Sequence, residues 1–223
     1  MRESSAVNAK SPTERTRLRR LHERGRFDKE SLHAILDAGL LCHVGYVVDG
    51  APVVTPTLYW REGDRVYWHG SSASHMLRHQ AGGAPVCLTV SHLDGIVLAR
   101  SGFHHSVNYR SVMLFGNARQ VTGAAAKERH LKTFMEQLYP GRWDQLRPLT
   151  AQEIKATKLL GMDIDEASAK IRTGPPIDDE EDYALPIWAG VVPVRRVIGA
   201  PVPDPRLMAG VAEPDNLRRL ILG

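Results

Sequence analysis

Cysteine is scarce in this chain of 223 residues, which contains only Cys42 and Cys87. Both lie in apolar runs that are typical of strands, and two thiols are too few to cross-link a domain of this size or to form a zinc knuckle. We therefore predict buried, unpaired thiols. The hydrophobic content of 43% is enough to build a sizeable core in one large domain or two small ones.

The sequence also lacks a long hydrophobic run. No stretch approaches the roughly 20 apolar residues that span a bilayer. The first residues carry charges and a proline instead of the apolar segment of a signal peptide. We therefore expect a cytoplasmic protein with no membrane partner.

Several catalytic signatures are absent. The chain has no GxGxxG or Walker-type loop, no GxSxG elbow, and no HExxH or paired Cys/His spacing. The adjacent His104 and His105 would point to opposite sides of an extended segment, so they do not form a metal site by themselves. These absences disfavour a hydrolase, and no metal site is predicted.

Charge is unevenly distributed along a chain whose formal net charge is +4. Residues 15–26 are rich in arginine, residues 178–182 are acidic, and the aromatic residues lie elsewhere. A nucleic-acid-binding surface combines basic and aromatic side chains on one face. A nucleic-acid partner is therefore not expected.

Most of the chain alternates with the period of two that is typical of strands. Asp28 is expected to cap a short helix that ends before Gly39, and Asp49-Gly50 lies between apolar runs as in a β-hairpin. Thr150 and Glu153 predict a capping box. After this hairpin, strands are predicted at 65–69, 85–92, 96–101, 110–122, 162–172 and 188–194, with a turn at Asp94-Gly95 and helices at 76–80, 123–139 and 150–160.

Short antiparallel strands with few helices between them favour a mainly β (α+β) fold, a barrel of six to eight strands with flanking helices. We predict three regions. Residues 1–26 form a flexible basic arm, residues 27–200 form the barrel domain, and residues 201–223 form a tail with a short helix.

Gly70-Ser71-Ser72-Ala73-Ser74-His75 is the first candidate ligand site, because it precedes a predicted helix. Unpaired backbone N–H groups at a helix start and the nearby serine hydroxyls form the outline of a phosphate site. In the alternative interpretation a serine only caps the helix. The sequence alone leaves both interpretations open.

The second candidate site is residues 106–111, which lead polar side chains into an apolar strand. Asn108, Tyr109, Arg110 and Ser111 would bring donors and a positive charge to the rim of the core. The alternative is a turn from which Arg110 reaches solvent. A phosphate site and a donor-rich strand entrance together match FMN, whose reduced ring is anionic.

Four motifs resemble the pyridoxamine 5'-phosphate oxidase-like FMN-binding split-barrel superfamily, in particular its flavin-nucleotide-binding branch, which includes the nitroimidazole-resistance proteins. The resemblance implies a split β-barrel homodimer with FMN at the subunit interface. The motifs are Tyr67-Trp-His69-Gly70-Ser71, His105-Ser-Val-Asn108-Tyr109-Arg110-Ser111-Val, Ser168-Ala-Lys170-Ile-Arg172-Thr-Gly174-Pro175-Pro176 and Asp182-Tyr-Ala-Leu-Pro186-Ile-Trp188-Ala-Gly190-Val.

By position, the resemblance also implies which residues bind the cofactor. One strand would run along the flavin, a second segment would lie near the phosphate, and a third would border the ring or ribityl chain. Lys170 and Arg172 would add charge, and Trp188 would reach the cleft from the partner subunit. The three segments are Val53, Val54, Thr55, Pro56 and Thr57; Gly70, Ser71, Ser74 and His75; and Asn108, Tyr109, Arg110 and Ser111.

The sequence departs from the true oxidase at two places. His75-Met76 stand where the oxidase has an Arg-Lys pair, and the Arg-x-His segment that grips pyridoxal phosphate is not evident near Arg195-Arg196. A vitamin B6 oxidase is therefore not expected.

We expect instead an FMN-dependent oxidoreductase that passes electrons from NAD(P)H to a small electron-poor acceptor. His69 and Tyr109 are the candidates for contact with this small-molecule substrate. The alternative is a non-enzymatic protein that binds or senses a flavin, a deazaflavin or haem. FAD is a further cofactor consistent with the sequence.

Overall fold

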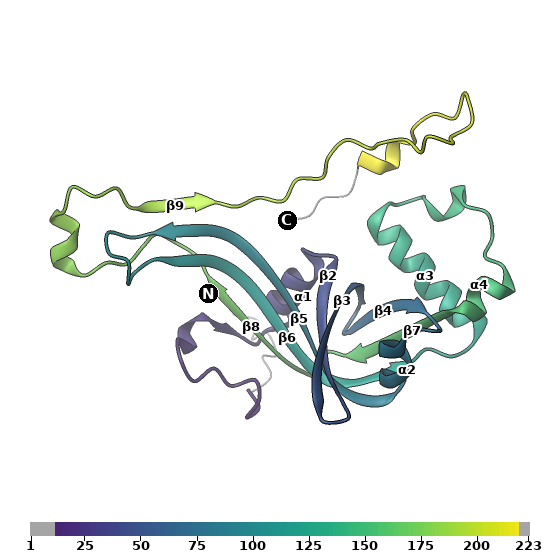
Figure 1. Ribbon diagram of the computed structural model, residues 1–223, viewed down its shortest axis with the longest axis horizontal. Helices are drawn as coiled ribbons and strands as arrows, with labels where there is room; N and C mark the ends of the chain where they lie inside the picture. The colour runs from purple at the N-terminus through teal and green to yellow at the C-terminus, as the bar shows by residue number, and fades with distance from the viewer. Residues whose placement is uncertain (1–11, 219–223) are drawn as a thin grey trace, which may run out of the picture.

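The computed structural model of the chain describes residues 12–218, which form a nine-stranded antiparallel sheet with few helices (Figure 1). The strands are β1 (Gly25–Arg26), β2 (Leu41–Val48), β3 (Ala51–Glu62), β4 (Arg65–Ser71), β5 (Gly82–Leu98), β6 (Ser106–Gln120), β7 (Thr157–Asp163), β8 (Glu166–Arg172) and β9 (Gly190–Pro193). The helices are α1 (Lys29–Asp37), α2 (His75–Gln80), α3 (Ala124–Leu138) and α4 (Ala151–Ala156), with single 3-10 turns at His22–Arg24, Trp143–Gln145, Glu180–Ala184 and Asp215–Arg218.

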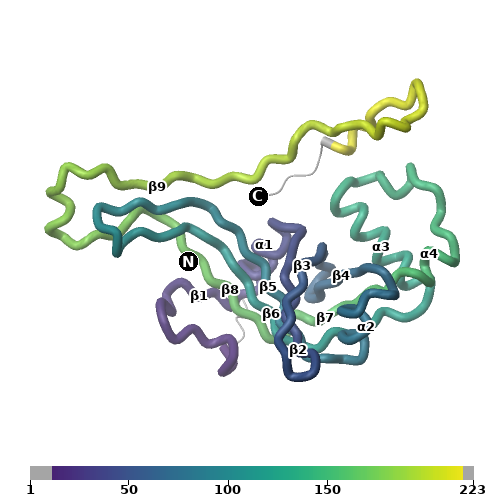
Figure 2. The backbone as a smooth tube through the Cα atoms, in the orientation of Figure 1, coloured from purple at the N-terminus to yellow at the C-terminus, as the bar shows by residue number. Residues whose placement is uncertain are grey.

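The strand order is β1-β8-β6-β7-β4-β3-β2-β5-β9, and an additional pairing of β6 with β5 closes six of the strands into a ring. The predicted mainly β split barrel is therefore confirmed. Strands β5 and β6 continue beyond the ring as a long ribbon, flanked by β8 along β6 and by β9 along β5 (Figure 2).

Two helices contribute to the barrel core, and a third packs on the outside. Leu36 of α1 and Leu77 of α2 belong to the same buried cluster as the inward-facing strand residues. Phe134 of α3 belongs to a second cluster, with Trp60, Tyr67 and Leu159 on the outside of the barrel. The longest of the predicted helices thus packs on the outside of the sheet as a flanking helix.

The helix caps and the hairpin turn predicted from the sequence are present in the structure. The Asp28 side chain accepts a hydrogen bond of 2.8 Å from the Ser31 N–H at the start of α1. Asp49 and Gly50 have φ angles of 49° and 78° in the β2–β3 hairpin, and Thr150 and Glu153 form the capping box of α4. These features depend only on residues a few positions apart.

The predicted turn at Asp94-Gly95 is wrong, because β5 runs through it with one irregularity between Leu93 and Gly95. A Cβ on Gly95 would lie 2.9 Å from Val191, so the glycine allows the close approach of β9. The Asp94 carboxylate forms a two-point ion pair with Arg110 on β6. Both residues serve contacts between strands instead of a turn.

The helix predicted at 150–160 ends early, since α4 stops at Ala156 and β7 begins at Thr157. The strand predicted at 162–172 is the end of β7 followed by β8. Leu160 is buried in the barrel core and Leu159 in the second cluster. A strand buried on both faces shows no alternation of apolar and polar residues, which explains the error.

Residues 194–218 form an arm that crosses from the β5–β6 ribbon toward α3 (Figure 1). Hydrogen bonds attach it at several points, among them the Val194 N–H to the Asp94 carbonyl, Arg196 to the Ala38 carbonyl and to His92, and the Asn216 side chain to the Pro140 carbonyl. Many side chains between these points are exposed. The tail helix is present as a single turn, while Leu220 and Ile221 lie outside the described residues.

At the other end of the described chain, residues 12–26 lie on the same sheet. β1 pairs with β8, and Thr13 and Arg15 both bind the Glu166 carboxylate. Residues 1–11 of the predicted basic arm lie outside the described residues.

His92 links the arm to α1 through a specific protonation state. Its Nε2 lies 2.9 Å from the Ile35 carbonyl and donates to it, so Nδ1 is unprotonated and accepts from Arg196. Burial lowers the pKa of His92, as do the nearby Arg196 and Arg110, while the bond to Ile35 and the Asp94 charge oppose the shift. Protonation at Nδ1 would place two positive charges in contact.

We expect the free energy of unfolding to fall as the pH drops below about 6.5, the pKa of an unfolded histidine. The unfolded chain then binds a proton that folded His92 resists, so acid favours unfolding. Thermal unfolding between pH 7.5 and 5 measures this. His92→Gln should reduce the acid-dependent fall, and His22→Gln, at an exposed position, should leave it unchanged. Identical pH profiles for all three proteins would contradict this assignment.

Candidate functional site

The register of the sheet decides which predicted cofactor contacts share a face. Residues paired across antiparallel strands project to the same side, as do alternate residues along a strand. Val44, Leu88 and Val112 project into the barrel core, so their neighbours in sequence project outward. By register, this outer face of the sheet carries six of the predicted contacts, although the Arg172 guanidinium binds Asn108: Val54, Pro56, Tyr109, Ser111, Lys170 and Arg172.

The outer face is also unusually apolar for an exposed sheet. Leu41, Val54, Leu58 and Met113 are between 41% and 64% exposed. Contiguous exposed apolar surface marks sites that bind ligands or other proteins. Ser111 and Lys170, which pair with each other across β6 and β8, add a hydroxyl group and a positive charge to it.

A second group of predicted contacts lies at the start of α2. The Ser74 hydroxyl accepts from the Leu77 N–H at 3.4 Å, and the Ser71 hydroxyl accepts from the Ala73 N–H at 3.2 Å. Ser74 therefore does cap the helix, as the alternative interpretation held. An accepting hydroxyl still has its own O–H to donate, so both serines remain able to bind an anion.

Strand β3 leads from this second group to the outer face. The Tyr46 ring lies 5.7 Å from His79 of α2, and the Tyr46 hydroxyl lies 3.3 Å from Thr55 Oγ1. Val54 and Pro56, on either side of Thr55, project to the outer face. One end of that face is therefore near α2.

The structure places the remaining predicted contacts elsewhere. Asn108 and Arg110 project to the opposite side of β6 from Tyr109 and Ser111. The Asn108 amide binds Arg172 and the Gly174 carbonyl, and the hydrogen bond to Asp94 raises the pKa of Arg110. Two others are Thr57, whose hydroxyl donates to the Leu58 carbonyl, and Trp188, which is 68% exposed ahead of β9.

His69, a predicted substrate contact, lies on β4 outside the barrel core. Its ring meets Trp60 and Phe134 edge-on, at centroid distances of 5.8 and 5.6 Å. Nδ1 is buried and has no hydrogen-bond partner among the described residues, and burial lowers the pKa of the imidazole. A neutral imidazole with an unshared nitrogen lone pair is the form that binds metal ions.

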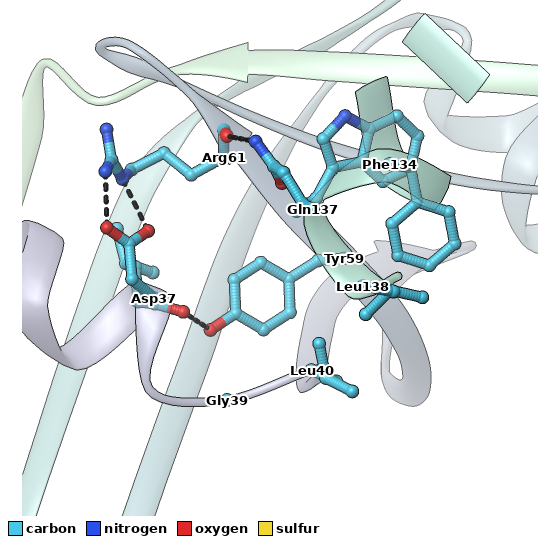
Figure 3. A pocket seen from close by; sticks show the side chains of 10 residues that line it. Asp37, Gly39, Leu40, Tyr59, Arg61, Phe134, Gln137 and Leu138 are labelled. Carbon is cyan, nitrogen blue, oxygen red and sulfur yellow. Dashed lines mark hydrogen bonds and ion pairs between the residues drawn. The ribbon is translucent and has the colours of Figure 1, made fainter. Parts of the chain in front are cut away.

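A cavity that the sequence did not predict lies where the end of α1, strand β3 and helix α3 meet (Figure 3). Its volume is about 290 Å³. Its lining comes from three separated parts of the chain, so no local motif marks it. The residues that line it are Leu36, Asp37, Gly39, Leu40, Tyr59, Trp60, Arg61, Phe134, Gln137 and Leu138.

Comparison with protein families identifies the fold. The profile of the family described as pyridoxamine 5'-phosphate oxidase matches residues 28–171, which is more than half of the chain. The chain belongs to the pyridoxamine 5'-phosphate oxidase family. The superfamily suggested by the sequence motifs is therefore confirmed, and the match ends just before the loop and arm that follow β8.

Solved structures similar to this chain include two that share more than a third of its sequence. The flavocytochrome Anf3 from Azotobacter vinelandii is 50% identical over 96% of this chain and 99% of that one, with a TM-score of 0.92. The FAD and heme binding protein from Mycobacterium smegmatis is 39% identical over 88% and 97%, with a TM-score of 0.85. A protein from Bacteroides thetaiotaomicron described as a 5-nitroimidazole antibiotic resistance protein is 22% identical over 65% and 84%, with a TM-score of 0.53, and shows a likeness of fold alone.

Two further findings concern the curated proteins and the possibility of a membrane-spanning helix. The search of curated proteins returns no match. Among the described residues, no helix is both long enough and apolar enough to cross a membrane.

Proposed function

We propose that this chain is a flavin-binding redox protein that passes electrons from NAD(P)H to a small, electron-poor acceptor. The observation that carries the proposal is the outer face, where exposed apolar side chains adjoin the hydroxyls of Tyr109 and Ser111 and the ammonium group of Lys170. A flavin ring has apolar faces and a polar edge that gains negative charge on reduction. The 50% identity to a flavocytochrome and the 39% identity to an FAD and heme binding protein support this choice.

The residues of the outer face fit a flavin by their chemistry. In this proposal Val54 and Pro56 pack against the ring and the Lys170 charge favours the reduced anion. Tyr109 donates a hydrogen bond, and the Ser111 hydroxyl, which donates to the Lys170 carbonyl, accepts one. A bound flavin supplies the hydride and electron transfer itself. The side chains therefore bind and orient, and none of them has to act as an acid or base.

The phosphate end of the cofactor belongs, in the same proposal, to Gly70, Ser71, Ser74 and His75 at the start of α2. The sequence motifs predict FMN, whereas the relative described as FAD-binding favours FAD. Both nucleotides carry the same ring and a phosphate next to the ribityl chain. Because that relative covers 88% of this chain, FAD is the flavin we expect, with FMN as the outcome that the motifs predict.

A second copy of the chain is proposed to cover what the cofactor leaves exposed. Leu41 and Leu58 pair across β2 and β3 and are 50% and 46% exposed, which is costly for a surface left in water. Trp188, on the loop before β9, is available to reach such a partner. This arrangement supports the proposed homodimer with the cofactor at its interface.

The proposal is tested on the purified protein by its absorbance spectrum, before and after FAD or FMN is added, and by mass spectrometry of the flavin released on denaturation. We expect a flavin spectrum that bleaches under anaerobic NADH or NADPH, and light scattering from a particle with the mass of two chains. A colourless protein that takes up neither flavin would overturn the proposal. Tight flavin binding without reduction by either donor would favour the alternative, a binding or sensing protein.

The charge on the outer face gives a sharper prediction. Lys170→Met should weaken flavin binding by about tenfold, which corresponds to about 1.4 kcal/mol, because methionine keeps the length of the side chain and loses the charge. Isothermal titration of flavin-free protein measures this. Lys155→Met, on an exposed position of α4, is the matched control and should bind as the unaltered protein does. Equal affinities for the two variants would remove Lys170 from the site.

Haem is the second cofactor that we propose, and His69 is the observation that favours it. Its Nδ1 is buried and has no hydrogen-bond partner within residues 12–218, and its lowered pKa suits an iron ligand. Two relatives are described as a flavocytochrome and as an FAD and heme binding protein. Bound haem would supply one-electron chemistry. The pyridine haemochrome assay on the purified protein tests for it, and protein that takes up no haem would remove this second candidate.

A further inference from the structure

The cavity beside α1 and α3 has the size of a two-ring molecule. An engineered apolar cavity of about 150 Å³ holds one benzene molecule. The cavity here is about 290 Å³, roughly twice as large. A fused bicyclic ring system therefore matches its volume.

The lining separates into an apolar part and a polar part (Figure 3). Phe134 and Leu138 lie on one side, with Tyr59 between them and the ion pair of Asp37 with Arg61 on the other side. The Arg61 Nε lies 2.8 Å from Asp37 Oδ1. A planar ligand could thus bury its rings against apolar walls and keep its polar atoms at the ion pair.

The charge of the cavity favours a neutral ligand. Asp37 and Arg61 neutralise each other. The Tyr59 hydroxyl donates to the Leu36 carbonyl, and burial raises the pKa of Tyr59, so its phenol stays uncharged. A ligand with a full charge would lose hydration here without gaining an opposite charge.

The polar side offers hydrogen-bond donors. Among the described residues, Arg61 uses three of its five guanidinium N–H groups, two for Asp37 and one for the Gly63 carbonyl. Gln137 uses one amide N–H for the Arg61 carbonyl at 2.8 Å, which leaves a second. The donors that remain match a carbonyl oxygen on the ligand.

The rim of the cavity is held in place by the arm. Arg196 donates to the carbonyl of Ala38, which lies between Asp37 and Gly39 of the lining. His92 packs so closely on Gly39 that a Cβ there would lie 2.6 Å from the imidazole Cε1. A preformed rim reduces the entropy that binding costs.

We propose that this cavity binds a neutral, planar, bicyclic molecule with a carbonyl group at one edge. Trp60 and Phe134 line the cavity and also contact the His69 ring. A bound ligand is therefore separated from His69 by a single layer of aromatic side chains, and its arrival changes the surroundings of that imidazole. The site stands independently of the flavin proposal, since none of its lining residues is among those proposed to hold the flavin.

The test is isothermal titration of the purified protein with coumarin, a neutral bicyclic lactone. Naphthalene lacks the carbonyl and coumarin-3-carboxylate carries a charge, so we expect both to bind at least about tenfold more weakly than coumarin. Leu138→Trp fills the cavity and should abolish coumarin binding. Leu146→Trp places the same side chain at a position that is 40% exposed and should leave binding unchanged.

A second variant keeps the test decisive if Leu138→Trp folds poorly. Gln137 is exposed, so Gln137→Leu is expected to fold, and it should weaken coumarin binding several-fold without affecting naphthalene. The imidazole NMR signals of His69 should shift when coumarin is added. The proposal is overturned if the protein does not bind coumarin, or if Gln137→Leu and a folded Leu138→Trp both bind it as tightly as the unaltered protein.

Discussion

With His69 as the proposed haem ligand, replacement of His69 by alanine is expected to remove the proposed haem absorption of the purified protein and to leave the proposed flavin absorption in place. The imidazole is the only iron ligand that we propose for this site, and its Nδ1 has no competing hydrogen-bond partner among the described residues. Loss of a group that merely hydrogen-bonds a metal ligand costs about 10–100-fold in affinity. Loss of the ligand itself should exceed that, so haem titration of His69→Ala should show a drop of more than about 100-fold.

The control for this prediction is another histidine close to the barrel. His79 lies on α2 with its ring near Tyr46, and His79→Ala should keep the haem spectrum. Imidazole added to His69→Ala should restore part of the absorption, because the removed ring leaves space for it. If His69 had a purely structural role, His69→Phe would retain haem and only the free energy of unfolding would change. Retention of haem by both His69 variants would exclude His69 as the ligand.

Features that depend on neighbouring residues could be predicted from the sequence. The hairpin at Asp49-Gly50 and the caps at Asp28 and Thr150 formed because each depends on a contact within three positions of the chain. The error at Asp94-Gly95 has the opposite origin. Asp94 forms an ion pair with Arg110, and Gly95 allows β9 to approach through Val191, which lies 96 positions further along the chain.

The candidate site was predicted only in part for a similar reason. Residues 108–111 read as one polar motif, yet in a strand successive side chains alternate between faces. Tyr109 and Ser111 thus reach the outer face, while Asn108 and Arg110 make internal contacts with Arg172 and Asp94. A continuous motif on a strand can supply at most half of its side chains to one surface.

Replacement of Trp68 by alanine is expected to be the most destabilising single change in the barrel. Trp68 is fully buried, and its indole N–H donates to the side-chain oxygen of buried Gln80 at 3.2 Å, which ties β4 to α2. Removing a large buried aromatic costs about 3–5 kcal/mol. Leaving the Gln80 oxygen without a donor adds about 1–3 kcal/mol. Equilibrium unfolding in urea measures the total.

Trp188→Ala is the matched control, because that indole is 68% exposed. In the isolated chain its removal should change the free energy of unfolding by less than about 0.5 kcal/mol. Trp68→Phe helps to separate the two parts of the main effect, since it keeps one aromatic ring in the core and loses the hydrogen bond together with the smaller ring. A Trp68→Ala protein as stable as Trp188→Ala would mean that Trp68 is not buried between β4 and α2 in solution.

The hydrogen bond between Trp68 and Gln80 can be isolated by a double-mutant cycle. The second amide atom of Gln80, Nε2, has no partner among the described residues, so this buried amide is only half satisfied. Each single change removes the hydrogen bond and leaves one polar group buried alone. Trp68→Phe leaves the Gln80 oxygen without its donor, and Gln80→Met leaves the Trp68 N–H without its acceptor. Making both changes removes the polar pair altogether, which costs less than the sum of the single changes when desolvation dominates. We therefore expect the double variant to be more stable than additivity predicts, by about 0.5–3 kcal/mol; strict additivity would show that the two side chains do not interact.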